Sequence, residues 1–491
     1  MTADESSWKT KAAAKFAAVR DKIPAEWHLA PEYLKGDENS DFGVFDIPAQ
    51  CGILSQAELD ITQRYTAVSL ARTVQSGKLK SKDVATAFCK RAAIATQLTN
   101  CLTETMFEDA LKRGEYLDQY LAEHRKPVGP LHGVPISIKD SFHYPNVQSS
   151  IGFVSFLDHP ADKDTAALVQ ILLELGAIIY CKTNIPQTLM TGDSHNHIFG
   201  RTLNPHKLKL NAGGSSGGEG ALVAFRGSIL GVGTDIGGSI RIPALCNGTY
   251  GFKPSSHRVP YGGQTAPVKL GSPGFPPVAG PLANSFEDLH FFMKCVIEAK
   301  PWNKDFLALS IPWRASAADE PFPKIRIGYL LQDEQYPIHP PVKRALEESA
   351  KKLAAAGFDI VPIKNFPRLQ SGLDMALDCY SLDNTKTWKK FIHDSGEPMV
   401  PSIARTENAI NKKEKYELEE VFDLNLAWGG YKAGWQKVWA ENQLDVILCP
   451  GAENTAVLHD TYGLPVYTAV WNLLEVSRLY VDGADQMLTC F

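Results

Sequence analysis

Two glycine- and serine-rich segments contain the side chains of this sequence that are best suited to chemistry. The first, 211–220, reads NAGGSSGGEG, and the second, 231–241, reads GVGTDIGGSIR. A Gly-Gly-Ser unit ends at Ser215 in the first segment and at Ser239 in the second. A serine hydroxyl becomes a nucleophile when a base removes its proton and hydrogen-bond donors stabilise the developing oxyanion. The two segments therefore point to acyl transfer to a serine.

The glycines before Ser239 provide the donors that such a reaction needs. Successive glycines let several backbone N–H groups point into one concavity. The candidate donors are the amides of Ile236, Gly237, Gly238 and Ser239. The stretch between the two Gly-Gly-Ser units is predicted to be a helix followed by a strand, an arrangement that can return the second unit to the first.

Lys139 is the candidate base. It lies on the polar face of a strand predicted over 133–140, whose other face carries Val134, Ile136 and Ile138. A typical lysine is exposed to solvent and charged. A lysine in a poorly hydrated site can instead lose its proton near neutral pH, because burial disfavours the charged form.

Simpler motifs fit less well. The Gly-x-Gly at 231–233 begins like a dinucleotide fingerprint but lacks the third glycine, and no GxxxxGK[ST] loop is present. Two GxSxG matches within 213–218 follow a poor strand, although a nucleophile elbow needs a strand there. His195 and His197 have no third ligand at a suitable spacing. We therefore expect no metal and no organic cofactor.

Predicted helices and strands alternate along the chain around these segments. Strands over 133–140 and 177–181 with a helix over 166–175 between them predict a parallel α/β unit. Further strands are predicted over 325–330, 358–362 and 444–448, with a helix over 342–356. We expect the late strands to join the same mixed sheet, which gives an α/β fold with an α/β/α layered architecture.

The first part of the chain is predicted to be helical. Residues 1–27 read as an amphipathic helix, and Ser55 with Glu58 forms a capping box at the start of another. Apolar residues continue at helical spacing until Gly77, which ends that run. A further helix is expected over 103–123.

The length sets a first estimate of the domain number. A chain of 491 residues corresponds to roughly three domains at about 150 residues each. Lys139, Ser215 and Ser239 must meet in one site, however, so a single catalytic domain, 76–491, behind a helical N-terminal extension, 1–75, fits better.

Composition excludes several classes of protein. With 44% hydrophobic and 21% charged residues, the chain is a folded protein and not a disordered one. The net charge of −5 argues against a nucleic-acid binder, and no apolar run is long enough for a transmembrane segment. Nine cysteines without a CxxC pair suggest thiols in a reducing, cytoplasmic location. No pattern encodes the oligomeric state, and a homodimer stays open.

At these residues the sequence resembles the amidase-signature family. The matching motifs are GVPISIKD (133–140), GGSSGGEGAL (213–222), GVGTDIGGSIRIPA (231–244) and YGFKPS (250–255). Flanking segments such as KPVGPLHG and KTNIPQTLM look most like the fungal acetamidases. The resemblance covers most of the chain and implies the amidase-signature α/β/α sandwich with a mixed central sheet.

The resemblance also implies roles for individual residues. Ser239 takes the place of the nucleophile, Ser215 that of a bridging serine after a cis peptide bond, and Lys139 that of the base. The oxyanion hole falls on Ile236, Gly237 and Gly238.

Other positions take supporting places by the same resemblance. Ser216, Thr234, Asp235 and Arg241 look like residues that hydrogen-bond the loop, and a purely structural role is the preferred interpretation. Leu189 and Met190 lie where the family lines its acyl pocket, with core packing as an equal alternative.

The implied activity is cleavage of small carboxylic acid amides to acid and ammonia through an acyl-enzyme. The alternatives are an esterase, the amidase subunit of an amidotransferase, or a non-catalytic or misfolded paralogue. The last is motivated by the end of the chain, where residues 476–491 are shorter than the family's closing strand and helix. We expect an incomplete C-terminal end and an exposed sheet edge there.

Overall fold

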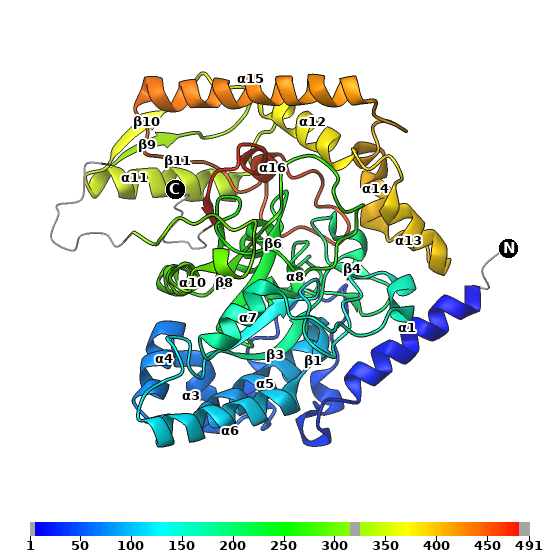
Figure 1. Cartoon of the computed structure of the whole chain (residues 1–491), viewed down its shortest axis with the longest axis vertical. Helices are drawn as coiled ribbons and strands as arrows, with labels where there is room; N and C mark the ends of the chain where they lie inside the picture. Colours follow the sequence, from blue (N-terminus) through cyan, green and yellow to red (C-terminus); the bar gives the residue numbers. More distant parts are fainter. Residues whose placement is uncertain (1–4, 315–324, 481–491) are drawn as a thin grey trace.

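The central feature of the fold is a mixed sheet (Figure 1). A computed structural model describes residues 5–314 and 325–480, and in these ranges the largest sheet has seven strands. They are β1 (Leu102–Thr105), β2 (Pro135–Lys139), β3 (Ile178–Thr183), β6 (Leu230–Asp235), β7 (Tyr250–Lys253), β8 (Val278–Ala283) and β12 (Arg478–Tyr480). Their order is β1-β3-β2-β6-β8-β7-β12. Strand β2 is parallel to both β3 and β6, and the other pairings are antiparallel.

Helices cover both faces of this sheet. Every residue of β2, β3, β6 and β8 is buried, and successive side chains of a strand point to opposite faces. The contacting helices include α5 (Ser81–Thr99), α6 (Phe107–His124), α8 (Gly217–Ala224) and α10 (Phe286–Glu298), with α7 (Ala167–Glu174) packed against α10. The predicted α/β/α layering and the parallel unit of β2, α7 and β3 are confirmed.

The late strands form a sheet of their own, so the prediction that they join the main sheet is wrong. Strands β9 (Arg326–Tyr329), β10 (Asp359–Pro362) and β11 (Val446–Leu448) pair in parallel in the order β10-β9-β11. Helix α11 (Pro340–Ala355) connects β9 to β10 and contacts β10, which closes a local unit. The sequence pattern identifies the strands, but it carries no signal for the partner of each strand.

The second sheet has its own hydrophobic core, which we call the second core cluster. It combines β9 and β11 with α12 (Leu369–Tyr380), α15 (Leu418–Asn442) and α16 (Val466–Leu473). Helix α15 lies at the end of the molecule opposite α5 and α6 (Figure 1). Other elements of the described residues include α2 (Ile47–Gln50), α9 (Arg241–Asn247), α13 (Thr387–Ser395), α14 (Pro401–Ile410), β4 (His195–Asn196) and β5 (Gly200–Arg201).

Helices also make up the N-terminal part, but the run predicted to end at Gly77 is broken. Helix α1 covers Glu5–Arg20, α3 covers Gln56–Arg64 and α4 covers Ala67–Gln75. Thr66 caps α4 in a second capping box with Ser69, and Tyr65 is extended. Two adjacent helices can share one apolar periodicity, which is why the break escaped the sequence pattern.

The helix predicted over 103–123 begins late. Residues Leu102–Thr105 form β1, which pairs antiparallel with β3 and is completely buried, and α6 starts only at Phe107. Threonines at 103 and 105 suit a buried strand at a sheet edge better than a helix start.

Two further expectations concern a transmembrane segment and the end of the chain. No helix within residues 5–314 and 325–480 is long and apolar enough to cross a membrane. The end of the chain from residue 481, including Cys490, lies outside the described residues, as do residues 1–4. The division into 1–75 and 76–491 stays a prediction.

Candidate active site

The end of strand β2 places Lys139 against Ser215. Lys139 Nζ donates to Ser215 Oγ at 2.6 Å and to Thr234 Oγ1, near the end of the neighbouring strand β6, at 2.8 Å. Ser215 lies just before helix α8 and follows a cis peptide bond with Gly214. Both Lys139 and Ser215 are buried. Three segments of the chain therefore converge on the side-chain nitrogen of Lys139.

The surroundings of Lys139 favour its neutral form. Burial lowers the pKa of Lys139 to about 7, although Asp235 and Glu219 oppose the shift. Among the described residues, no carboxylate lies within 4.0 Å of Nζ to form an ion pair. The amine can therefore accept a proton from its hydrogen-bond partner Ser215 near neutral pH.

Ser239 is brought to the same place through the backbone. The N–H of Ser216, the residue after the first Gly-Gly-Ser unit, donates to the carbonyl of Ser239 in the second unit at 3.1 Å. The Ser216 hydroxyl lies 3.3 Å from both the N and the O of Thr234. Ser239 is partly exposed, whereas Ser215 is buried. The intervening helix and strand are α8 and β6, as predicted, and they return the second unit to the first.

The 236–240 loop contains the backbone amides that were predicted as oxyanion donors, and they differ in their hydrogen bonds. The Gly238 N–H donates to Asp235 Oδ1 at 2.9 Å and is therefore occupied. Within the described residues, the amides of Ile236, Gly237 and Ser239 have no protein acceptor. Gly238 adopts a φ of +129°, which favours glycine. In the described part of the structure the Gly238 amide has an acceptor and the other three do not, and the assignment of the oxyanion hole stays a prediction.

An ion pair between Asp235 and Arg241 fixes the 236–240 loop. Asp235 accepts the amides of Gly238 and Ile240 and makes a two-pronged ion pair with Arg241, at 3.0 and 2.8 Å. Burial opposes ionisation of Asp235, but Arg241 outweighs it and holds the pKa of Asp235 below its usual range. Arg241 also donates to Thr468 O. This geometry fits the purely structural interpretation of the two residues.

Several residues near the loop were missed by sequence reasoning. Tyr380 and Thr468 donate to the carbonyls of Ile236 and Gly237, and Asn472 contacts both Asp235 and Arg241. They come from α12 and α16, and no local pattern in the sequence signals these long-range contacts.

Glu219 is another buried group beside Lys139. It accepts hydrogen bonds from Ser137 at 2.5 Å and Thr183 at 2.9 Å. Burial raises the pKa of Glu219 to about 8, against those hydrogen bonds. An acidic residue inside the glycine-rich motif was the signal that could have identified it.

Leu189 and Met190 lie in a separate apolar cluster. Both are partly buried against a core that includes Ile151, Phe153 and Trp388. Leu189 has a positive φ of 61°. Their part in substrate binding stays a prediction, with core packing as the alternative.

The described residues contain no group of three or more His, Cys, Asp or Glu side chains arranged to hold a metal ion. Burial lowers the pKa of His195 to about 4. The cysteines within the described ranges are free thiols.

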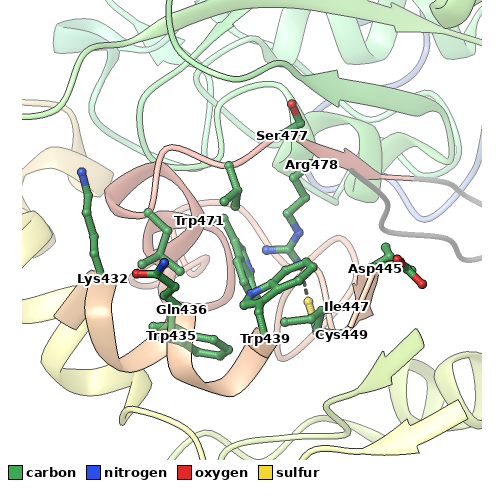
Figure 2. Close-up of a pocket in the computed structure, with 13 residues that line it drawn as sticks. Lys432, Trp435, Gln436, Trp439, Asp445, Ile447, Cys449, Trp471, Ser477 and Arg478 are labelled. Carbon is green, nitrogen blue, oxygen red and sulfur yellow. Dashed lines mark hydrogen bonds between the residues drawn. The ribbon is translucent and has the colours of Figure 1, made fainter. Parts of the chain in front are cut away.

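A cavity of about 470 Å³ lies away from these residues, between α15, β11, α16 and β12 (Figure 2). Its walls carry Trp439 and Trp471, and the Arg478 guanidinium points towards Cys449. None of the predicted site residues lines it.

The fold and the paired serine segments define an amide-hydrolysing class of enzyme. Residues 83–481 match the protein family described as Amidase, which is more than half of the chain. The chain therefore belongs to this family, and it is an amidase.

Curated relatives and a solved structure agree with this family assignment. An amidase of Gibberella moniliformis is 41% identical over 96% of this chain and 89% of that protein. An acetamidase of Emericella nidulans is 39% identical over 97% and 86%. The structure of a fatty acid amide hydrolase superposes with a TM-score of 0.90 at 32% identity, covering 98% of this chain and 85% of that chain.

Proposed function

We propose that this amidase cleaves the C–N bond of small carboxylic acid amides through an acyl-enzyme on Ser239, with Ser215 as the bridging hydroxyl and Lys139 as the base. The observation that carries the proposal is the 2.6 Å hydrogen bond from Lys139 Nζ to Ser215 Oγ inside a buried site. The similarity to proteins named amidase and acetamidase supports small amides as the substrate class.

The reaction begins with proton transfer. Neutral Lys139 takes the proton of Ser215, and Ser215 takes that of Ser239 while the Ser239 oxygen attacks the amide carbon. The carbonyl π electrons move to oxygen, and the oxyanion accepts hydrogen bonds from the amides of Ile236, Gly237 and Ser239.

The intermediate collapses by breaking the C–N bond. The proton held by Lys139 returns through Ser215 to the leaving nitrogen, so that ammonia departs as a neutral molecule. Water then attacks the acyl-enzyme by the same proton route, which releases the carboxylic acid and restores Ser239.

The test is ammonia release from acetamide, benzamide and glutamine, together with labelling by a fluorophosphonate. Wild-type protein should release ammonia from acetamide or benzamide and become labelled. Ser239→Ala should lose both activities, and Lys139→Ala should lose at least about a hundredfold in rate. Ser76→Ala, at the end of α4, is the control and should behave as wild type.

Four outcomes would replace the proposal. Full activity of Ser239→Ala would remove Ser239 as the nucleophile. Ammonia from glutamine alone would favour an amidotransferase subunit, and hydrolysis of esters without amides would favour an esterase. Folded protein without hydrolysis or labelling would identify a non-catalytic paralogue.

A further inference from the structure

We propose that Tyr380 is a positioning residue of the oxyanion hole, whose hydroxyl directs the Gly237 amide towards the reacting carbonyl oxygen. Tyr380 ends helix α12 in the region of the second core cluster, 144 positions from the loop that it contacts. Its hydroxyl donates to the carbonyl of Ile236 at 2.6 Å. The inference deepens the proposed acyl-enzyme function and rests on it.

The direction of the Gly237 amide follows from peptide geometry. The Ile236 carbonyl and the Gly237 N–H belong to one planar peptide unit, which is trans, so they point in opposite directions. Tyr380 fixes the carbonyl on one side of the loop. The N–H therefore faces the other side, where the described residues offer it no protein acceptor.

The next peptide unit shows why Tyr380 is the residue of interest. Thr468 Oγ1 donates to the Gly237 carbonyl at 2.7 Å in the same way, but the Gly238 N–H of that unit is occupied by Asp235. Two consecutive carbonyls are thus held by hydroxyls, and of their two amides only that of Gly237 is available. A donor on the carbonyl also polarises the peptide, which makes its N–H a stronger donor.

The packing around Tyr380 leaves little freedom. A Cβ on residue 237 would lie 2.8 Å from the Tyr380 hydroxyl, so glycine permits the approach. Phe275 packs edge-on against the Tyr380 ring, with 5.5 Å between the ring centroids. Burial raises the pKa of Tyr380, so the hydroxyl keeps the proton that it donates.

The test compares Tyr380→Phe with Tyr431→Phe. The Tyr431 hydroxyl donates to the Arg368 carbonyl at 3.2 Å, in the same cluster but away from the loop. Each variant is assayed on the simple amide that wild type hydrolyses, with kcat expressed per serine titrated by fluorophosphonate. Binding of trifluoroacetophenone, which forms an oxyanion on the serine, is compared with binding of the carboxylic acid product.

In Tyr380→Phe we expect kcat to fall roughly tenfold and KM to stay within about twofold, a smaller loss than deletion of a donor itself. Affinity for the ketone should fall by the same factor, and affinity for the acid should not change. Tyr431→Phe should leave all four quantities unchanged.

Other results would overturn the inference. A normal kcat per titrated serine in Tyr380→Phe, with unchanged ketone affinity, would do so even if the variant were less stable. If Tyr431→Phe lost as much kcat and ketone affinity as Tyr380→Phe, the loss would reflect packing of the second core cluster and not the bond to Ile236. A wild type that hydrolyses nothing and binds no ketone would be a failure of the proposed function itself, and the inference would fall with it.

Discussion

Arg241 Nη2 donates to Asn472 Oδ1 at 2.5 Å, across 231 positions of sequence. The same asparagine donates from Nδ2 to Asp235 Oδ1 at 2.9 Å. One side chain of α16 therefore contacts both members of the ion pair beneath the 236–240 loop.

Removing Asn472 should destabilise the protein. In Asn472→Ala, buried polar atoms of Asp235 and Arg241 each lose a partner, which costs about 1–3 kcal/mol in the free energy of unfolding. Urea unfolding measures this loss. The control is Asn442→Ala, whose side chain bonds Val438 O within its own helix. Equal stability of the two variants would contradict the role of Asn472.

The rate should depend on the charge of Lys139. Because burial lowers its pKa to about 7, kcat/KM should rise with pH through about 7 as the neutral base forms, and then level off. A profile measured from pH 5 to 9 checks this. Burial also lowers the pKa of Lys253 to about 7. In Lys253→Met the rise of kcat/KM with pH should persist. If it disappeared in that variant, Lys253 and not Lys139 would be the group that titrates.

The free energy of unfolding should also depend on pH through Lys139. Between the folded value of about 7 and the ordinary value of 10.5, the unfolded chain binds more protons at position 139 than the folded one does. Stability therefore gains a contribution that increases with pH across this window. Lys139→Met should lack it, so the difference in unfolding free energy between wild type and variant should change from pH 7 to 10. A constant difference would argue against the lowered pKa.

Alanine at position 238 should disrupt the loop. Its φ of +129° disfavours a side chain, and a Cβ there would lie 2.4 Å from Thr468 Oγ1. We expect Gly238→Ala to lose at least about a hundredfold in kcat, comparable to loss of an oxyanion donor. Gly463→Ala separates the two causes, because its φ is +81° but no atom lies within 4 Å of the added Cβ. If both variants lost activity to a similar extent, the contact of the added Cβ with Thr468 would not be the cause of the loss in Gly238→Ala.

The break between α3 and α4 can be tested through its cap. Thr66→Ala removes the hydroxyl that accepts the Ser69 N–H, and we expect a loss of about 1 kcal/mol in unfolding free energy. Thr86→Ala is the control, because the Thr86 hydroxyl donates to Lys82 O within α5. A larger loss in Thr86→Ala than in Thr66→Ala would contradict the assignment of the cap.

Local patterns predicted the elements that carry the site. The alternation around Lys139 identified β2, and its buried apolar face follows from that alternation. The two Gly-Gly-Ser units identified the segments that meet, since helix α8 and strand β6 lie between them and contact each other. These features depend on neighbours in sequence, so the sequence contains their signal.

The remaining features depend on partners far away in sequence. Thr103 and Thr105 joined a helical pattern because nothing near them reveals that β3 lies alongside. The Gly238 amide is an exception, because its acceptor Asp235 is only three positions away, and what the pattern did not predict is the turn between them. Tyr380, Thr468 and Asn472 reach the loop from helices that belong to the other core.

That arrangement has a consequence for inactivation. The 236–240 loop stands on the main sheet, but Ile236 packs against the second core cluster, and hydroxyls from α12 and α16 hold its carbonyls. Regions of a protein can open separately when their free energies of opening differ. Opening of the smaller sheet with its helices would release the loop while the main sheet stays folded. In a denaturant series, activity should therefore disappear while the part of the circular dichroism that comes from the helices on the main sheet is still present.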